Sequence, residues 1–317
     1  EWLAEDLYHA AQQHRICVAP VMDFEDMSAS EHLRFREFFE KVELGELGEL
    51  ELMRGATLRS SGRVSFVRAA PDLGEHNEDI ELLPERQQTS KSESIGLPLE
   101  GVRVLDMTWA WAGPFCSLNL AHLGAEVIRI ESAKRADLYR RMPVFPEDWE
   151  PTLNNSGMFN QWNQGKSSIS VDLGHERGLE IVRELVAKSD VLVQNFATGV
   201  LERLGLGYDE LKSINPRLVL VSISGYGQTG PYREYMGYGP AMPPLAGLSE
   251  GTGYIGGGPQ EMGLSMPDPT AGITGTLGVV SALIKREQTG EGDHLDISLW
   301  EATAVLNLSG WMDYVVD

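Results

Sequence analysis

From residue 97 onward, short apolar runs alternate with amphipathic stretches along the chain. The pattern predicts strands at 101–107, 124–131, 190–194, 217–224 and 295–299, and helices ending at His122, over 176–188, over 208–214 and from Glu301. Helices between consecutive strands are typical of βαβ units, which place the strands in parallel. The run at 217–224 is almost continuously apolar, as a strand buried on both faces should be. The pattern therefore predicts an α/β fold with an open parallel sheet and flanking helices.

The first 83 residues follow a different pattern. They are predicted to form helices over 1–19 and 30–42, a short strand over 63–67 and a turn-rich segment over 70–76. This mixture indicates a partial α+β small domain. Residues 84–96 consist mainly of Gln, Ser, Lys and Glu, a composition typical of a linker. We therefore divide the chain into residues 1–83, a linker over 84–96, and a large domain over 97–317, with 225–265 as Gly- and Pro-rich loops.

One aspartate, Asp268, stands between two prolines. Each proline fixes its own φ and biases the preceding residue away from the α region, so we expect Asp268 to be extended. The residue fits the N-cap of a following helix, with Pro269 at the first helical position. The helix dipole would also keep a carboxylate ionised at this place, as nucleophilic catalysis by a carboxylate requires. The two interpretations are compatible.

The helix that follows Asp268 carries two stripes of residues. Its apolar positions recur with helical spacing at Ile273, Leu277, Val280 and Ile284. At every third position, a second stripe contains only small residues: Gly272, Gly275, Gly278 and Ser281. Glycine inside a helix costs about 1 kcal/mol relative to alanine. The glycines therefore predict close approach of another backbone or of a flat ligand.

Composition and charge narrow the possible functions. The chain has 317 residues, of which 42% are hydrophobic, so it can bury a sizeable core. A net charge of −21 argues against binding to nucleic acids or anionic membranes. An anionic ligand would then need a local cluster of positive charge. The two cysteines, Cys17 and Cys116, form neither a disulfide framework nor a metal-binding pattern, which fits a reducing cytoplasm.

The ends and the apolar runs of the chain give three further expectations. No apolar run approaches the roughly 20 residues that a membrane-spanning helix needs. No secretory signal is recognisable at the start of the sequence. The chain opens in the middle of a helical pattern and without a methionine, so we expect it to be a piece of a longer protein.

A nicotinamide or flavin site is one alternative for the first βαβ unit. Glu131 ends the second predicted strand about 20 residues after the first loop, where a ribose-binding acid would stand. That loop, however, lacks the Gly-x-Gly-x-x-Gly pattern and contains two tryptophans. Glycines let a pyrophosphate approach the backbone, and indole rings would obstruct it. We therefore do not expect a dinucleotide.

Four stretches resemble the class III CoA-transferase family, the group of carnitine, bile-acid and formyl-CoA transferases. They extend from Gly101 to Glu131, from Asn163 to Leu173, from Asn195 to Gly205 and from Asp268 to Gly292. Residues 1–83 resemble the end of another copy of the same family. The chain is thus similar to the seam of a tandem transferase, without the start of its first copy or the end of its second.

The resemblance implies an architecture and a chemistry. The large domain would be Rossmann-like, and the subunits would interlock as a homodimer or as a pseudo-dimer within one chain. We expect residues 1–83 to pack only loosely against 97–317. Asp268 matches the family nucleophile, which takes an acyl group from acyl-CoA as a mixed anhydride, then forms an aspartyl-CoA thioester, and finally passes CoA to a carboxylic acid. Coenzyme A as acyl-CoA and a small carboxylic acid are the implied partners, and no metal is implied.

The resemblance also assigns binding residues. Five positions match CoA-contacting positions of the family: Ala112, Lys166, Asn195, Phe196 and Arg203. Ser132 stands where some members carry a CoA-contacting arginine, which shifts that role to Lys134 or Arg135. Arg140 and Arg141 belong to the same local cluster of cations.

Two tryptophans, Trp109 and Trp111, flank the approach to the site in the same resemblance. They are either core residues or an aromatic wall for a cationic acceptor, because indole faces attract quaternary ammonium and sulfonium groups. Dimethylsulfoniopropionate is one acceptor of this kind, which leaves a CoA-transferase/lyase of that compound as an alternative.

Two further alternatives remain. The fold also hosts α-methylacyl-CoA racemases, which need a histidine about 30 residues before the aspartate. Tyr238 occupies that place here, and no histidine lies between 176 and 293. The chain could instead be a non-catalytic scaffold half of a pseudo-dimer, although it retains Asp268.

Overall fold

The structure, a computed structural model, describes residues 2–44, 47–54, 58–59, 96–142, 144, 147–263 and 265–316. The predicted strand at 63–67, the turn-rich segment at 70–76 and all but the last residue of the predicted linker lie outside the described residues.

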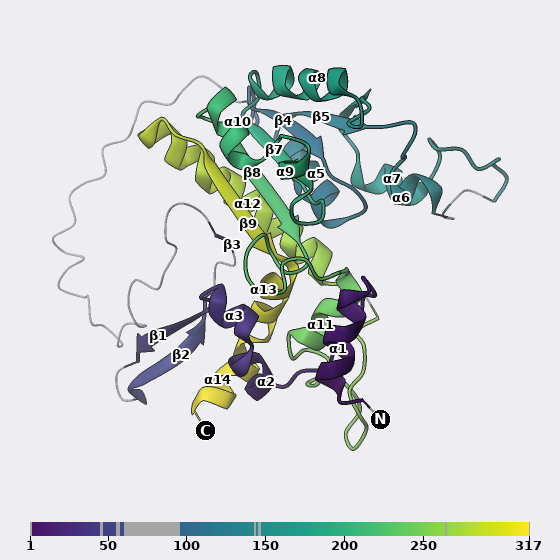
Figure 1. The fold of residues 1–317 in the computed structure, drawn as a ribbon. Helices are drawn as coiled ribbons and strands as arrows, with labels where there is room; N and C mark the ends of the chain where they lie inside the picture. Colours follow the sequence, from purple (N-terminus) through teal and green to yellow (C-terminus); the bar gives the residue numbers. More distant parts are fainter. Residues whose placement is uncertain are drawn as a thin grey trace.

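A seven-stranded sheet forms the centre of the large domain (Figure 1). Its strands are β3 (Leu58–Arg59), β4 (Arg103–Met107), β5 (Glu126–Glu131), β6 (Ser167–Ser170), β7 (Val191–Gln194), β8 (Val219–Ser224) and β9 (Asp293–Ser298). They lie in the order β3-β9-β8-β7-β4-β5-β6, and the six from β4 to β9 are parallel, while β3 pairs antiparallel with β9. The predicted open parallel sheet is confirmed. Its strand order reverses between β4 and β7, as in dinucleotide-binding doubly wound folds.

Helices cover both faces of the sheet. One face carries α5 (Ala112–His122) and α12 (Pro267–Thr289), and the other carries α8 (Glu176–Val186) and α10 (Tyr208–Ile214). Successive strand residues point to opposite faces, so Val104 joins the core with α5 and α12 while Leu105 joins the core with α8 and α10. The remaining helical elements of this part are α6 (Leu138–Arg141), α7 (Gly157–Trp162), α9 (Val200–Arg203), η2 (Gly239–Ala241), α11 (Met242–Leu245), α13 (Leu299–Ala304), η3 (Val305–Asn307) and α14 (Leu308–Val316).

The small-residue stripe of α12 faces α5. A Cβ atom built on Gly272 would lie 2.8 Å from the Ala112 carbonyl oxygen, and one on Gly275 would lie 3.0 Å from Cys116 Sγ. Close approach of the α5 backbone therefore explains Gly272, while side chains from α5 and the sheet crowd Gly275. Three of the apolar positions of the helix, by contrast, are more than half exposed: Ile273, Leu277 and Ile284.

The N-terminal residues form a small α+β unit. It consists of α1 (Ala4–Gln13), α2 (Phe24–Ala29), α3 (Glu31–Phe35) and a hairpin of β1 (Phe39–Glu43) with β2 (Glu49–Met53). Figure 1 shows this unit beside α11, α13 and α14, below the large sheet.

The expectation that the N-terminal unit packs loosely is wrong. Met27, Leu33 and Met53 are fully buried in the same hydrophobic core as Trp300 and Trp311 from α13 and α14. These side chains pack against the C-terminal helices. Burial of each large apolar side chain contributes roughly 1.5–3 kcal/mol to the free energy of folding. The N-terminal unit is thus integrated with the large domain.

A buried ion cluster adds to this interface. The Arg36 guanidinium lies between two buried carboxylates, with Nη1 2.8 Å from Asp296 Oδ2 and Nη2 3.2 Å from Glu301 Oε2. Arg36 follows α3, whereas its partners belong to β9 and α13. The cluster therefore fixes the N-terminal unit to the end of the parallel sheet.

Several predicted element bounds are corrected. The helix predicted over 1–19 is limited to α1, and the one predicted over 30–42 ends at Phe35. Glu37 has φ +53° and interrupts the helix, after which Phe39 and Val42 turn inward from β1. Pairing with β2 thus overrides a helical spacing of apolar residues. The edge strand β6 was not predicted, because its Ser-Ser-Ile-Ser sequence contains a single apolar residue.

Asp268 is neither extended nor an N-cap. It lies in the first turn of α12, which begins at Pro267 after the N-cap Met266. Both prolines are compatible with this turn, because the first N–H groups of a helix have no acceptor within it. The carboxylate is therefore carried by the helix itself.

Candidate active site

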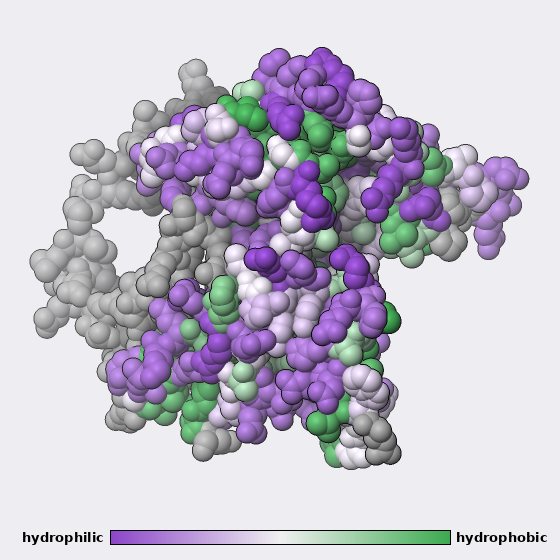
Figure 2. Space-filling model, in the orientation of Figure 1, coloured by the Kyte–Doolittle hydropathy of each residue, from purple (hydrophilic) through white to green (hydrophobic). Residues whose placement is uncertain are grey.

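A cavity of about 1450 Å³ opens at the carboxyl ends of the parallel strands. Loops that follow β4, β5, β7 and β8 line it, together with the start of α12. Doubly wound sheets bind ligands in the crevice where the strand order reverses, which is here between β4 and β7. The space-filling view shows the surface hollowed between the arm that carries α6 and α7 and the body that carries α1 (Figure 2).

The Asp268 carboxylate forms part of the cavity wall. Its Oδ2 accepts a hydrogen bond from Ser265 Oγ at 3.1 Å, and the Ala112 backbone N–H also donates to the carboxylate. Burial raises the pKa of Asp268 above its ordinary value, while the hydrogen bonds from Ser265 and Ala112 oppose that rise. A Cβ atom at Gly239 would collide with Asp268 Oδ2 and Ser265 Oγ, so a larger residue there would displace the carboxylate.

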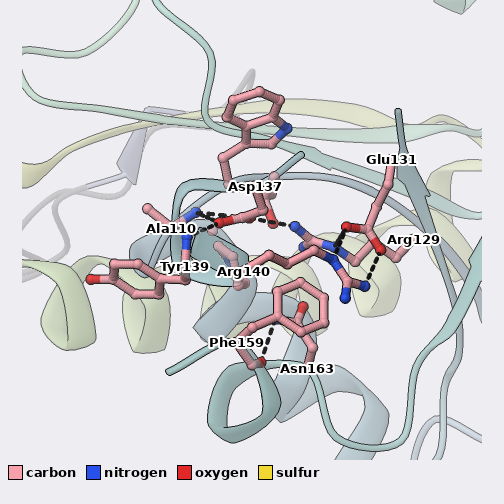
Figure 3. Close-up of polar contacts among 12 residues, drawn as sticks. Ala110, Arg129, Glu131, Asp137, Tyr139, Arg140, Phe159 and Asn163 are labelled. Atoms are coloured by element: carbon pink, nitrogen blue, oxygen red, sulfur yellow. Dashed lines mark hydrogen bonds and ion pairs between the residues drawn. The ribbon is translucent and has the colours of Figure 1, made fainter. Parts of the chain in front are cut away.

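The loop between β4 and α5 is held from two sides. The Asn195 side chain accepts from the Trp109 N–H and donates to the Trp109 carbonyl, both at 2.7 Å. Asp137 accepts from the Ala110 N–H at 3.1 Å, from the Tyr139 N–H at 2.8 Å and from Arg129 Nη2 at 2.5 Å (Figure 3). These contacts hold Ala110 in a left-handed conformation, with φ +60°. The loop that ends at Ala112 is consequently fixed next to Asp268.

Ten of the eleven residues predicted for the site line this one cavity. They are Trp109, Trp111, Ala112, Lys134, Arg135, Asn195, Phe196, Arg203, Tyr238 and Asp268. The cavity thus joins positions that are as much as 159 residues apart in the sequence (Trp109 to Asp268).

Lys166 is the exception. Its side chain is 2% exposed, and Nζ donates to Asp106 Oδ2 at 2.9 Å, to Ser117 Oγ at 2.8 Å and to the Pro114 carbonyl at 2.9 Å. Burial alone would raise the pKa of the Asp106 carboxyl, but the charges of Lys166 and Arg129 hold it at about 2. Lys166 therefore links β4 to α5 in the protein interior and does not line the cavity.

Replacing Lys166 with methionine is expected to lower the free energy of unfolding by about 3 kcal/mol, because a buried carboxylate loses its closest cation. The measurement is denaturant unfolding, with the exposed Lys188→Met as a control that should change stability little. An unchanged stability together with a weaker affinity for CoA would instead support the family-derived contact between Lys166 and CoA.

The predicted cation cluster divides into two groups. Lys134, Arg135 and Arg141 line the cavity, with Lys134 Nζ 2.5 Å from Asp172 Oδ2. Arg140 turns away from the cavity: its guanidinium donates twice to Glu131 at 2.7 Å and lies 3.5 Å from the Phe159 ring centroid (Figure 3). Arg140 therefore stabilises the α6–α7 arm.

The two predicted tryptophans have neighbours on their rings. The Arg135 guanidinium lies 5.4 Å from the centre of the Trp109 ring, and Trp111 stacks on Trp162 at 5.2 Å. Tyr238 is 58% exposed and projects at the rim of the cavity. A cationic substrate would therefore compete with Arg135 for the Trp109 ring and with Trp162 for the Trp111 ring.

Sequence reasoning missed a part of the cavity wall. Arg15, Tyr235 and Met236 line it as well, and Arg15 comes from the N-terminal unit. No motif or spacing marked Arg15, because only the packing of α1 brings it to the site, whereas Tyr235 and Met236 come just before the predicted Tyr238.

Some kinds of site are not found within the described part of the chain. No three His, Cys, Asp or Glu side chains there are grouped so as to hold a metal ion. No histidine of the described residues lines the cavity. Among the same residues, no helix has the length and apolar character that crossing a membrane requires.

Comparisons with known proteins agree with this geometry. The family model of CoA-transferase family III matches residues 1–77 and 99–317. The chain is 39% identical over 209 residues to the succinyl-CoA–L-malate CoA-transferase beta subunit of Chloroflexus aurantiacus, covering 65% of the chain and 50% of that protein. It is 40% identical over 204 residues to the succinyl-CoA:glutarate CoA-transferase of Mus musculus, covering 64% of the chain and 45% of that protein. The chain spans about half the length of the curated relatives it matches.

Solved structures show the same relationship. A CAIB/BAIF family protein from Brucella suis superposes with a TM-score of 0.66 at 37% identity, covering 70% of this chain and 58% of that one. Rv3272 from Mycobacterium tuberculosis superposes with a TM-score of 0.64 at 31% identity, covering 69% and 60%. The sequence match, the sheet order and the cavity at its switch point lead to one conclusion: the chain belongs to the CoA-transferase family III.

Proposed function

We propose that this chain carries a catalytic centre that moves CoA from an acyl-CoA donor to a carboxylic acid, with Asp268 as the nucleophile. The observation that carries the proposal is the place of the Asp268 carboxylate, on the wall of a cavity large enough for a cofactor-sized ligand and beside the Ala112 N–H. Burial of the carboxylate removes water that would otherwise compete for its charge and favours attack on a thioester.

The proposed reaction begins with the donor. An Asp268 oxygen attacks the thioester carbonyl, the C–S bond breaks, and CoA leaves as a thiolate, which gives a mixed anhydride. The thiolate then attacks Asp268 Cγ, which releases the donor acid and leaves an aspartyl-CoA thioester. The acceptor carboxylate attacks the same carbon, the C–S bond breaks, and CoA thiolate leaves behind a second mixed anhydride. The thiolate then attacks the acceptor carbonyl carbon of this anhydride, which gives the new acyl-CoA and restores the aspartate. Backbone N–H groups such as that of Ala112 would stabilise the developing oxyanions.

The cations around the cavity support binding of CoA, which carries phosphates. Lys134, Arg135, Arg141 and Arg203 all line the cavity in a chain whose net charge is −21. Arginine donors match phosphate oxygens well, because the guanidinium offers paired N–H groups. We therefore assign the phosphates of CoA to this group of residues, and we retain the interlocked homodimer or intrachain pseudo-dimer as the proposed assembly.

The alternatives have less support. A racemase needs a second proton-transferring group, and no histidine of the described residues lines the cavity. A cationic acceptor needs open indole faces, while Trp109 lies beneath Arg135 and Trp111 stacks on Trp162. A purely structural role does not require a carboxylate on the wall of a large cavity, where Asp268 lies. Acyl and CoA transfer through Asp268 remains the function that the geometry favours.

Trapping of the covalent intermediate tests this proposal. The full-length protein is incubated with acetyl-CoA, treated with hydroxylamine and digested, and we expect a hydroxamate on the peptide that contains Asp268. Anhydrides and thioesters react with hydroxylamine, whereas a free carboxylate does not. A protein that transfers CoA without giving this hydroxamate would contradict the assignment of Asp268.

The rate of adduct formation is expected to depend on pH. Because the pKa of Asp268 is raised, the nucleophilic carboxylate is lost by protonation at a higher pH than for an ordinary aspartate. Single-turnover rates with acetyl-CoA should therefore fall on acidification. Ser265→Ala removes a hydrogen bond that lowers the pKa of Asp268. In this variant the midpoint of the rate against pH should therefore move to higher pH. A midpoint in Ser265→Ala that equals the wild-type midpoint or lies at lower pH would contradict the assignment of the pH dependence to the Asp268 carboxylate.

A further inference from the structure

Arg15 stands on the wall of the Asp268 cavity, although it lies more than 200 residues before that aspartate in the sequence. It follows the end of α1, which a buried side chain anchors to the large domain. Gln12 accepts from the Met236 N–H at 2.7 Å and donates to the Met236 carbonyl at 3.1 Å. This pair of hydrogen bonds fixes the end of α1 against the stretch that leads to Tyr238.

The same stretch packs against Asp268 in the fold. Met236 precedes Gly239 by three residues, and Gly239 is the residue that packs against the Asp268 carboxylate. Arg15 Nη2 lies 3.3 Å from Met236 Sδ. Arg15 therefore lines the cavity beside the stretch that contains Gly239, whereas Lys134 and Arg135 line it from the loop after β5.

The backbone of Arg15 is unusual for an arginine. Its φ is +57°, and among the described residues only Glu37 and Ala110 share a positive φ without being glycine. The Ile16 N–H donates to the Ala11 carbonyl at 3.0 Å, which closes α1 in a motif that favours glycine at the position of Arg15. An L-residue in this conformation is disfavoured. An arginine where glycine would fit best indicates a use for its side chain.

The charge of Arg15 is available to a ligand. The side chain is exposed, and no carboxylate of the described residues forms an ion pair with it. Its contact in the structure is a thioether sulphur, which is a weak acceptor. A guanidinium presents paired N–H donors in the geometry that matches a carboxylate. The cavity wall thus offers a guanidinium that can bind an anion and that lies apart from Lys134 and Arg135 in the sequence.

We propose that Arg15 binds a second carboxylate of the substrate, so that the site is built for dicarboxylic acids. The inference rests on the proposed function, because it takes the first carboxyl group to react at Asp268. The second carboxylate belongs either to the acyl group of the donor or to the acceptor acid. In both cases the N-terminal unit supplies a specificity-determining residue to a site whose nucleophile lies in the large domain.

Matched pairs of substrates test this proposal on the full-length protein. In the acceptor arm, kcat/KM is measured for succinate and for butyrate with acetyl-CoA as donor. In the donor arm, it is measured for succinyl-CoA and butyryl-CoA with acetate as acceptor. Each pair differs by the distal carboxylate, and a ratio taken within one variant does not depend on the fraction of active protein. The variants are Arg15→Ala, Arg15→Lys and, as a control on the exposed face of α8, Arg177→Ala.

Arg15→Ala should lower the ratio of dicarboxylate to monocarboxylate about tenfold or more in at least one arm, as loss of a charge-assisted hydrogen bond does. The arm in which it falls identifies the substrate that carries the second carboxylate. Arg15→Lys should give an intermediate ratio, because the charge remains while the paired donors are lost. Arg177→Ala should leave both ratios as in the wild type.

Ratios that stay within about twofold of the wild type in both arms for Arg15→Ala would overturn the proposal. An equal fall with Arg177→Ala would also overturn it, because the effect would then reflect net charge. Failure of the Asp268 chemistry is seen separately, as the absence of a hydroxamate on wild-type protein treated with acetyl-CoA, a donor without a second carboxylate. The two failures are thereby distinguished.

Discussion

Replacing Asp268 with asparagine is expected to lower kcat for CoA transfer by roughly 10⁴- to 10⁶-fold, the range seen when a covalent nucleophile is removed. Asparagine has nearly the same size and still accepts a hydrogen bond from Ser265, so the cavity should keep its shape. The amide lacks the charge and the nucleophilic oxygen that attack on a thioester requires. The measurement is the steady-state rate of CoA transfer to a carboxylic acid in the full-length protein.

A matched control for this substitution is Asp209→Asn. Asp209 occupies the same place in the first turn of α10 as Asp268 does in α12, but it is exposed and lies away from the cavity. We expect its rate to stay close to that of the wild type. A substantial residual rate in Asp268→Asn, above the level of contaminating wild-type protein, would show that another group carries the acyl transfer.

Replacing Arg36 with methionine is expected to lower the free energy of unfolding by about 3–5 kcal/mol, the usual cost of removing one charge from a buried ion pair. The substitution takes a guanidinium from between the buried carboxylates of Asp296 and Glu301. It also weakens the attachment of the N-terminal unit to the sheet. Chemical denaturation followed by tryptophan fluorescence measures the effect, since Trp300 and Trp311 lie in the shared core.

The control for Arg36→Met is Arg34→Met, two residues earlier. The Arg34 side chain is 42% exposed, and Nη1 lies 2.5 Å from Glu51 Oε1. Exposed ion pairs contribute at most about 1 kcal/mol, so this variant should remain nearly as stable as the wild type. Equal losses in both variants would mean that the buried cluster is not what joins the N-terminal unit to the large domain.

The parallel sheet was predictable because its strands are short apolar runs separated by amphipathic helices. Residues 219–224 illustrate this, since five of the six are buried and apolar residues dominate the strand. The edge strand β6 was not predicted for the opposite reason: it is polar, and three of its four residues are exposed. Strand identity at an edge depends on pairing with β5, which the sequence of β6 alone does not encode.

The helix that carries Asp268 was predicted, but the conformation of the aspartate was not. Local rules for proline favoured an extended residue, whereas the structure begins α12 at Pro267 and places Asp268 one residue inside it. The sequence left open whether the glycine stripe meets another backbone or a flat ligand, and the structure places the backbone of α5 against Gly272. Packing between two helices thus decided a question that the local sequence left open.

The candidate site was predictable where motifs marked it and unpredictable where only tertiary packing built it. Family motifs pointed to Asn195 and Ala112, which line the cavity. The same motifs pointed to Lys166, whose amine the structure places in a buried network with Asp106. Arg15 carried no motif at all, and it reaches the cavity because Gln12 binds the backbone of Met236.

Transfer of an oxygen atom to Asp268 tests the central claim most directly. The full-length protein is allowed to turn over with acetyl-CoA and an acceptor acid whose carboxyl oxygens are ¹⁸O, and the peptide containing Asp268 is then weighed by mass spectrometry. In the proposed reaction the acceptor oxygen bridges to Asp268 Cγ and stays there when the thiolate removes the acyl group. We predict that this peptide, and not the one containing Asp209, gains the mass of ¹⁸O during turnover. Turnover that leaves the Asp268 peptide at its original mass would contradict the account.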